Sequence, residues 1–165
     1  MRAPARYWLF LVLAAVLVLP GCGPTIDLTK GLKLEVVATG WLDVGPVTGK
    51  NKLVPAVRFT LKNISDQKLV ALQVNAVFRR VNEKEEWGAG LLPVAGSEGL
   101  APGATTATLT AKSALGYTGE ESREQMLQNT QFVDATVTLF SKYGSAQWVA
   151  IAQSPIQISR QILAP

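Results

Sequence analysis

The chain has 165 residues, a formal net charge of +4 from 16 basic and 12 acidic residues, and no histidine. The lack of histidine excludes a histidine triad, a histidine-ligated zinc site and a histidine general base. Basic and acidic residues are mixed along the chain, without a Lys/Arg-rich stripe and interleaved aromatic residues, so nucleic acid is not an expected partner.

Residues 1–21 are typical of a secretory signal peptide. Arg2 and Arg6 give a positive start, and an unbroken apolar run of 13 residues follows over Tyr7–Leu19. A transmembrane helix needs about 20 apolar residues, and Pro20 with Gly21 interrupts any helical continuation. We therefore expect the chain to be exported rather than held by a membrane-spanning helix.

The motif that ends this segment, Leu19-Pro20-Gly21-Cys22, resembles the bacterial lipobox. The resemblance implies that Cys22 takes a diacylglycerol on its sulfur, that the signal peptide is removed after Gly21, and that the new amino group is acylated. Cys22 is the single cysteine of the chain, as expected of an exported protein in which a stray thiol would mispair. The alternative is an ordinary signal peptide followed by an incidental cysteine.

The resemblance also implies where the mature protein resides. It would be anchored by lipid to a membrane of the bacterial cell envelope and face the periplasm. Gly23 stands where an aspartate would mark retention at the inner membrane, which favours the outer membrane. Apart from the covalent lipid on Cys22, we expect no cofactor.

One domain is expected after the signal peptide, since Cys22–Pro165 contains 144 residues, close to the common size of a single domain. Without Arg2 and Arg6, 14 basic residues remain against 12 acidic ones, so the net charge falls to +2. Turn-forming residues without a sustained period predict that residues 22–31 are a lipidated N-terminus and tether. Residues 32–165 are then the folded domain.

Alternating apolar and polar residues predict the first strands of this domain. Residues 32–39 alternate except at Val37, and a polar turn region follows over 45–52. Residues 57–62 and 70–78 alternate on either side of a turn over 63–67. Because these last two strands follow one another directly, we expect them to pair as a central hairpin.

The second half of the domain continues this pattern after the ambiguous residues 87–93. Alternation predicts strands over 106–111, 133–139, 147–153 and 156–162, with a turn at 100–103. Thr118-Gly119-Glu120-Glu121 matches a capping box, which predicts a short helix that reaches about Gln128. Seven or eight short strands with one brief helix predict an all-β fold, an antiparallel immunoglobulin-like β-sandwich.

A run in the middle of the domain, Val57-Arg58-Phe59-Thr60-Leu61-Lys62-Asn63-Ile64-Ser65, is followed by an alternating strand and by Leu100-Ala101-Pro102-Gly103. Together they resemble small immunoglobulin-like domains of bacterial envelope proteins, such as the FxLYD type, although the FxLYD signature itself is not present. The resemblance implies an accessory or ligand-binding module and names no chemistry.

Several short motifs that suggest chemistry have simpler interpretations. Ser65-Asp66-Gln67-Lys68 fits Ser-x-x-Lys, but it lies in a polar turn and lacks the Lys-Thr-Gly that accompanies that motif. Gly88-Ala89-Gly90 lacks the third glycine and the following helix of a phosphate loop. The acidic residues lie in solvated contexts without an Asp-x-Asp loop, so no metal site is expected. A non-enzymatic protein is therefore the favoured reading.

The aromatic residues of the mature chain either fill the core or line a ligand groove. Trp87, beside an acidic loop and close to Arg79 and Arg80, is the best candidate for a binding surface. We expect a binding or accessory module for another envelope protein, acting through this loop or an exposed sheet edge. The alternatives are a carrier or sensor of an apolar ligand between two sheets and, third, an unfamiliar hydrolase with two buried carboxylates.

Overall fold

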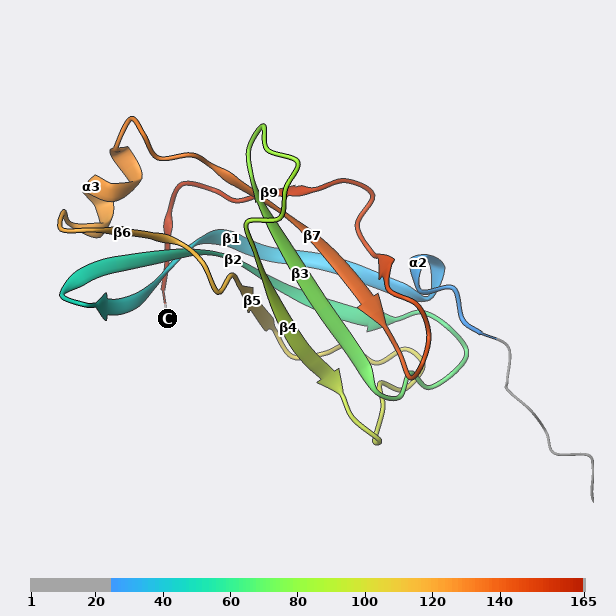
Figure 1. Ribbon diagram of the computed structural model, residues 1–165. Helices are drawn as coiled ribbons and strands as arrows, with labels where there is room; N and C mark the ends of the chain where they lie inside the picture. The colour runs from blue at the N-terminus through green and yellow to red at the C-terminus, as the bar shows by residue number, and fades with distance from the viewer. Residues whose placement is uncertain (1–24, 165) are drawn as a thin grey trace, which may run out of the picture.

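The structure, a computed structural model, describes residues 25–164. Two sheets pack face to face, with the second sheet in front of the first in Figure 1. This arrangement confirms the predicted all-β sandwich. Residues 1–21, which are expected to be a signal peptide, and Cys22 lie outside the described residues. No helix within the described residues is long and apolar enough to cross a membrane.

The first sheet has the strand order β10-β1-β2-β5, with β6 also paired to β2. Its two long strands form a hairpin with a two-residue loop, Thr48-Gly49, where φ is +52° and +82°. A loop with positive φ at both residues matches the right-handed twist of the strands. The strands are β1 (Leu32–Val47), β2 (Lys50–Asn63), β5 (Leu109–Lys112), β6 (Tyr117–Gly119) and β10 (Ile162–Leu163).

The second sheet has the order β4-β3-β7-β8, with β9 also paired to β7. The residues expected to be ambiguous, 87–93, lie mostly in β4, which pairs with β3 along its length. The strands are β3 (Leu72–Arg80), β4 (Gly88–Ala95), β7 (Ala135–Lys142), β8 (Val149–Ala150) and β9 (Ile156–Gln157).

The core lies between the sheets and takes its side chains from alternate positions. Phe59 on β2, Val74 and Phe78 on β3 and Leu139 on β7 have no exposed surface. Burial along β7 alternates strictly between buried and half-buried residues, as the period of a strand with one apolar face requires.

The predicted central hairpin is wrong, because β2 and β3 belong to different sheets. Their apolar faces oppose one another across the core instead of lying side by side in one ladder. Alternation identifies the buried face of a strand but not the strand that supplies its hydrogen bonds. The connection over residues 64–71 is also longer than the two to five residues typical of a hairpin loop.

Two further expectations need correction near the end of the chain. The single last strand over 156–162 is two strands, since β9 pairs with β7 in the second sheet and β10 pairs with β1 in the first. The capping box lies four residues later than predicted, at Ser122 and Gln125, ahead of helix α3 (Arg123–Gln128). Thr118 instead pairs with Lys52 in the β2–β6 ladder.

The last residues of the expected tether are packed on the domain. Leu28–Gly31 form a helical turn, α2, in which Leu28 is 2% exposed. The Ile26 amide donates a hydrogen bond to the Tyr143 hydroxyl over 2.5 Å. Hydrogen bonds from the Thr29 hydroxyl and amide to the carboxylate of Asp27, the N-cap, lower the pKa of Asp27. Apolar Ile26 and Leu28 explain why this segment docks on the core.

Candidate binding site

The three residues predicted for a binding surface flank the β3–β4 connection. The Arg80 guanidinium lies 5.7 Å from the centroid of the Trp87 ring and forms an ion pair with Glu83 at 2.9 Å. Arg79 donates from Nε to the Lys84 carbonyl over 3.1 Å. The structure therefore places Arg80 against Trp87 and Arg79 against the backbone of the connection, so both guanidinium groups are engaged by the connection itself.

Trp87 is not an open surface ring, because it is half-buried against an aromatic cluster. Its ring centroid lies 6.3 Å from Trp41 and 5.0 Å from Tyr117. Phe132 completes the cluster at 4.5 Å from Trp41 and 4.7 Å from Tyr117. Trp41, at the centre, has no exposed surface. The cluster fills the end of the sandwich opposite to the N-terminal segment.

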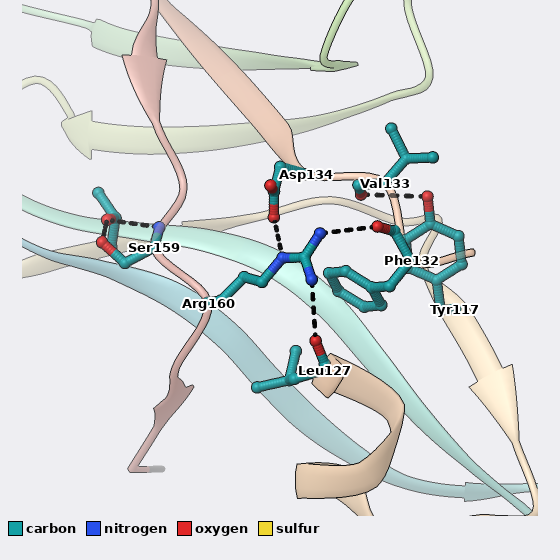
Figure 2. A network of polar contacts seen from close by, with 8 residues as sticks. Tyr117, Leu127, Phe132, Val133, Asp134, Ser159 and Arg160 are labelled. Atoms are coloured by element: carbon teal, nitrogen blue, oxygen red, sulfur yellow. Dashed lines mark hydrogen bonds and ion pairs between the residues drawn. The ribbon is translucent and has the colours of Figure 1, made fainter. Parts of the chain in front are cut away.

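Arg160 closes this end of the sandwich, as Figure 2 shows. Its Nε donates to the Asp134 carboxylate at 2.6 Å, and its two terminal nitrogens donate to the carbonyls of Leu127 and Phe132 at 3.2 and 2.8 Å. Its guanidinium also lies 5.2 Å from the centroid of the Phe132 ring. The residue thus joins the C-terminal segment to the end of α3 and to the start of β7, and its role is structural.

A hollow of about 260 Å³ lies beside the cluster, between β6 and α3. Tyr117, Met126 and Phe132 supply its apolar surface, while Glu121, Asn129 and Gln131 supply polar groups. A Cβ at Gly119 would lie 2.5 Å from a Glu121 carboxylate oxygen, at the end of a flexible side chain. Across residues 25–164, no group of three or more metal-ligating side chains is found.

The β4 edge of the second sheet is the more open feature. β4 is the terminal strand of its sheet and contains no charged residue. Leu91, at its middle, is 65% exposed, the highest value among the exposed large apolar residues of the described chain. A groove of about 350 Å³ runs beside it, lined by Leu91, Leu92, Thr110 and Lys112.

Two glycines bring β4 close to β5 at this groove. A Cβ at Gly90 would collide with the Lys112 carbonyl, and one at Gly88 would collide with the Ser113 hydroxyl. The sequence indicates an exposed sheet edge without identifying the strand, and the pattern of these glycines suggests only a phosphate loop. Pro93 was the available signal, because proline in a sheet is confined to edge strands, strand starts and bulges.

No protein-family model matches the chain, and no curated protein matches its sequence. A solved structure of the Northeast Structural Genomics Consortium target SoR45 is similar at 16% identity and a TM-score of 0.45, over 81% of this chain and 89% of that one. The ligand binding region of Serine-glutamate repeat protein A of Enterococcus faecium is similar at 14% identity and a TM-score of 0.34, over 82% of this chain and 100% of that one. Neither likeness bears on function.

Proposed function

We propose that the protein is a lipid-anchored, non-enzymatic binding module of a bacterial cell envelope. Cys22 carries the lipid, the domain faces the periplasm, and the β4 edge takes up an extended segment of another envelope protein. The uncharged, terminal position of β4 with its exposed Leu91 is the observation that carries the proposal. The lipid anchor rests on the resemblance of residues 19–22 to a lipobox.

An edge strand presents backbone N–H and C=O groups that another strand can pair with. In such strand addition the backbone hydrogen bonds supply affinity, and pockets for alternate side chains supply specificity. The groove between β4 and β5 provides that pocket, with Leu91 and Leu92 as apolar surface. Lys112 lines it without a carboxylate within 4.0 Å among the described residues. We therefore expect an apolar segment that carries an acidic residue.

Carriage of an apolar ligand between the sheets has less support. Such a carrier needs a cavity of about 300 Å³ or more between the sheets. Phe59, Val74, Phe78 and Leu139 fill that space with fully buried side chains. The hollows described above lie at the surface of the sandwich.

The β4 edge is tested by placing a photo-crosslinking residue at Thr110, which lines the groove, in the intact lipoprotein in its own envelope. We expect one predominant crosslinked protein. Leu91→Lys should abolish it, since a charge on an edge strand opposes pairing. Val44→Lys is the matched control, because Val44 is also exposed, at 38%, but lies on β1. Equal crosslinking by Leu91→Lys and wild type would exclude the β4 edge.

The anchor is tested on the same preparations by the mass of the N-terminal peptide. We expect acyl mass on residue 22 in the wild type. In Cys22→Ala we expect none, together with release of the protein from the membrane fraction. An unmodified Cys22 in the exported wild type would contradict the proposed lipid anchor, whereas the test of the β4 edge would remain valid.

A further inference from the structure

Three segments meet at the end of the sandwich where the described chain begins. We define this basal end as residues 25–31, the β2–β3 connection over residues 64–71, and the β7–β8 loop over residues 143–148. The Ile64 amide donates to the Gly31 carbonyl over 2.9 Å, and the Gly144 amide donates to the Val70 carbonyl over 3.2 Å. Figure 1 shows this end at the right, where α2 lies.

Large apolar side chains are exposed on each of the two loops of the basal end. Ile64 is 52% exposed, Val70 is 41% exposed and Trp148 is 38% exposed. The Lys142 ammonium lies 5.0 Å from the centroid of the Trp148 ring. An amphipathic indole ring and a positive charge therefore lie side by side. Tryptophan and lysine are both residue types that anchor proteins at the interface between bilayer and water.

The charges of the basal end are balanced. The Lys30 ammonium lies 3.9 Å from the Asp27 carboxylate, with the two side chains 86% and 50% exposed. Asp66 and Lys68 on the β2–β3 connection add one charge of each sign. Glu98, on the adjoining turn beside Lys68 and Val70, has its pKa lowered by hydrogen bonding to the Gly96 amide. Ionised acids therefore accompany the lysines. Such a surface suits phospholipid headgroups, which carry both signs of charge, better than a strongly acidic or basic macromolecule.

The proposed lipid on Cys22 would place this end near a membrane. Thr25, the first described residue, lines a groove together with Tyr143 and Val149. Only Gly23 and Pro24 separate Thr25 from Cys22. Even a fully extended chain would therefore put the Cα atoms of Cys22 and Thr25 at most roughly 10 Å apart. A lipid on Cys22 would hold the basal end, and not the opposite end with its aromatic cluster, against the bilayer.

We propose that the basal end is a membrane-docking surface, in which Trp148, Ile64 and Val70 enter the interfacial layer of a phospholipid bilayer. The inference rests on the proposed lipid at Cys22 for its geometry. It adds a second, protein-borne contact to the acyl chains. Docking would fix the orientation of the domain and leave the β4 groove accessible to a partner.

Tryptophan fluorescence tests the proposal on the mature lipoprotein. The protein is reconstituted into vesicles of phosphatidylethanolamine and phosphatidylglycerol whose acyl chains are brominated near the headgroups. Trp148 is the exposed tryptophan of the described chain, whereas Trp41 is fully buried and Trp87 is half-buried. We expect bromine to quench the wild-type emission and Trp148→Phe to abolish that quenching. Ile64→Ser should reduce it, and Val44→Ser, on the distant β1–β2 hairpin, should leave it unchanged.

If bromine quenches the wild type and Trp148→Phe equally, the docking surface is overturned, whether or not the N-terminal peptide carries the mass of the acyl chains.

If the acyl mass is absent, the proposed lipid anchor is overturned, and docking is tested separately by titrating the unacylated exported protein with the same vesicles. Docking then predicts that the unacylated protein binds the vesicles and that Ile64→Ser lowers its affinity roughly fivefold. This is the loss expected when about half of an isoleucine side chain is no longer buried. No measurable binding of that unacylated protein would overturn docking. Unchanged melting temperatures of the exposed-site variants show that each effect is local.

Discussion

Asn63 is a fully buried polar residue whose amide is used completely. Its Nδ2 donates to the carbonyls of Gln67 and Leu100, each at 2.8 Å. Its Oδ1 accepts from the Ser65 amide at 3.0 Å and from the Ser65 hydroxyl at 2.7 Å. The side chain thereby joins the start of the β2–β3 connection to the turn at Leu100.

Asn63→Asp should destabilise the domain by about 3 kcal/mol, since it replaces a donor with an acceptor facing two carbonyls and buries a charge. Denaturant unfolding measures this change in the free energy of unfolding. Asn82→Asp is the matched control, because Asn82 is exposed and has a positive φ that aspartate also tolerates. It should alter stability by less than about 0.5 kcal/mol. Similar losses in both variants would contradict the role given to Asn63.

Contacts between residues that are close in sequence could be predicted, whereas contacts between residues far apart in the chain could not. Arg80 and Trp87 flank one short connection, so their contact follows from the turn after β3. The contact of Trp41 with Phe132 joins residues far apart in the chain, and no local pattern indicates it. Arg160 was likewise missed, because its partners are two backbone carbonyls and a carboxylate brought near only by the fold.

At the scale of strands and helices, the one residue that breaks the alternation of the first strand marks a β-bulge. Val37 breaks the alternation of residues 32–39, and the β1–β2 register shifts between Val36 and Ala38. A bulge adds one residue to a strand and so reverses the pattern at that point. The turn expected at Gly45-Pro46 is another such irregularity within β1, with φ of +82° at Gly45, and the chain reverses at Thr48-Gly49.

The position of the capping box gives a prediction for α3. Ser122 accepts from the Gln125 amide at 3.3 Å, and the Gln125 side chain accepts from the Ser122 amide at 3.1 Å. Ser122→Ala should therefore cost about 1 kcal/mol. Thr118→Ala, at the position that the sequence favoured, should cost much less because its exposed side chain makes no hydrogen bond among the described residues. Hydrogen exchange of the α3 amides and thermal melting compare the two variants. A larger effect at Thr118 would show that the helix begins earlier.

At the scale of the whole molecule, the sequence predicted the class of fold but not the topology of its sheets. Alternation identified the buried faces of β2, β3 and β7, whereas the assignment of strands to sheets depends on long-range pairing. The parallel contact of β1 with β10 is an example, since it joins Trp41 to Ile162. The hydroxyls of Thr39 and Ser159, 2.9 Å apart, fasten the segment that crosses between the sheets. Neither pairing has a signal within a short window of sequence.

Phe59→Asp and Val74→Asp should each abolish the cooperative unfolding transition, although the two residues lie in different sheets. Both are fully buried in one core, and an unpaired carboxylate there costs more than the roughly 5–15 kcal/mol that stabilises a typical domain, unless it is protonated. Lys62→Asp on β2 and Asn75→Asp on β3 are the controls, since each lies on the outer face of its strand. Circular dichroism melting compares the four variants. A native-like transition in either core variant would mean that the two sheets do not share one core, and independent melting of one sheet would reveal it.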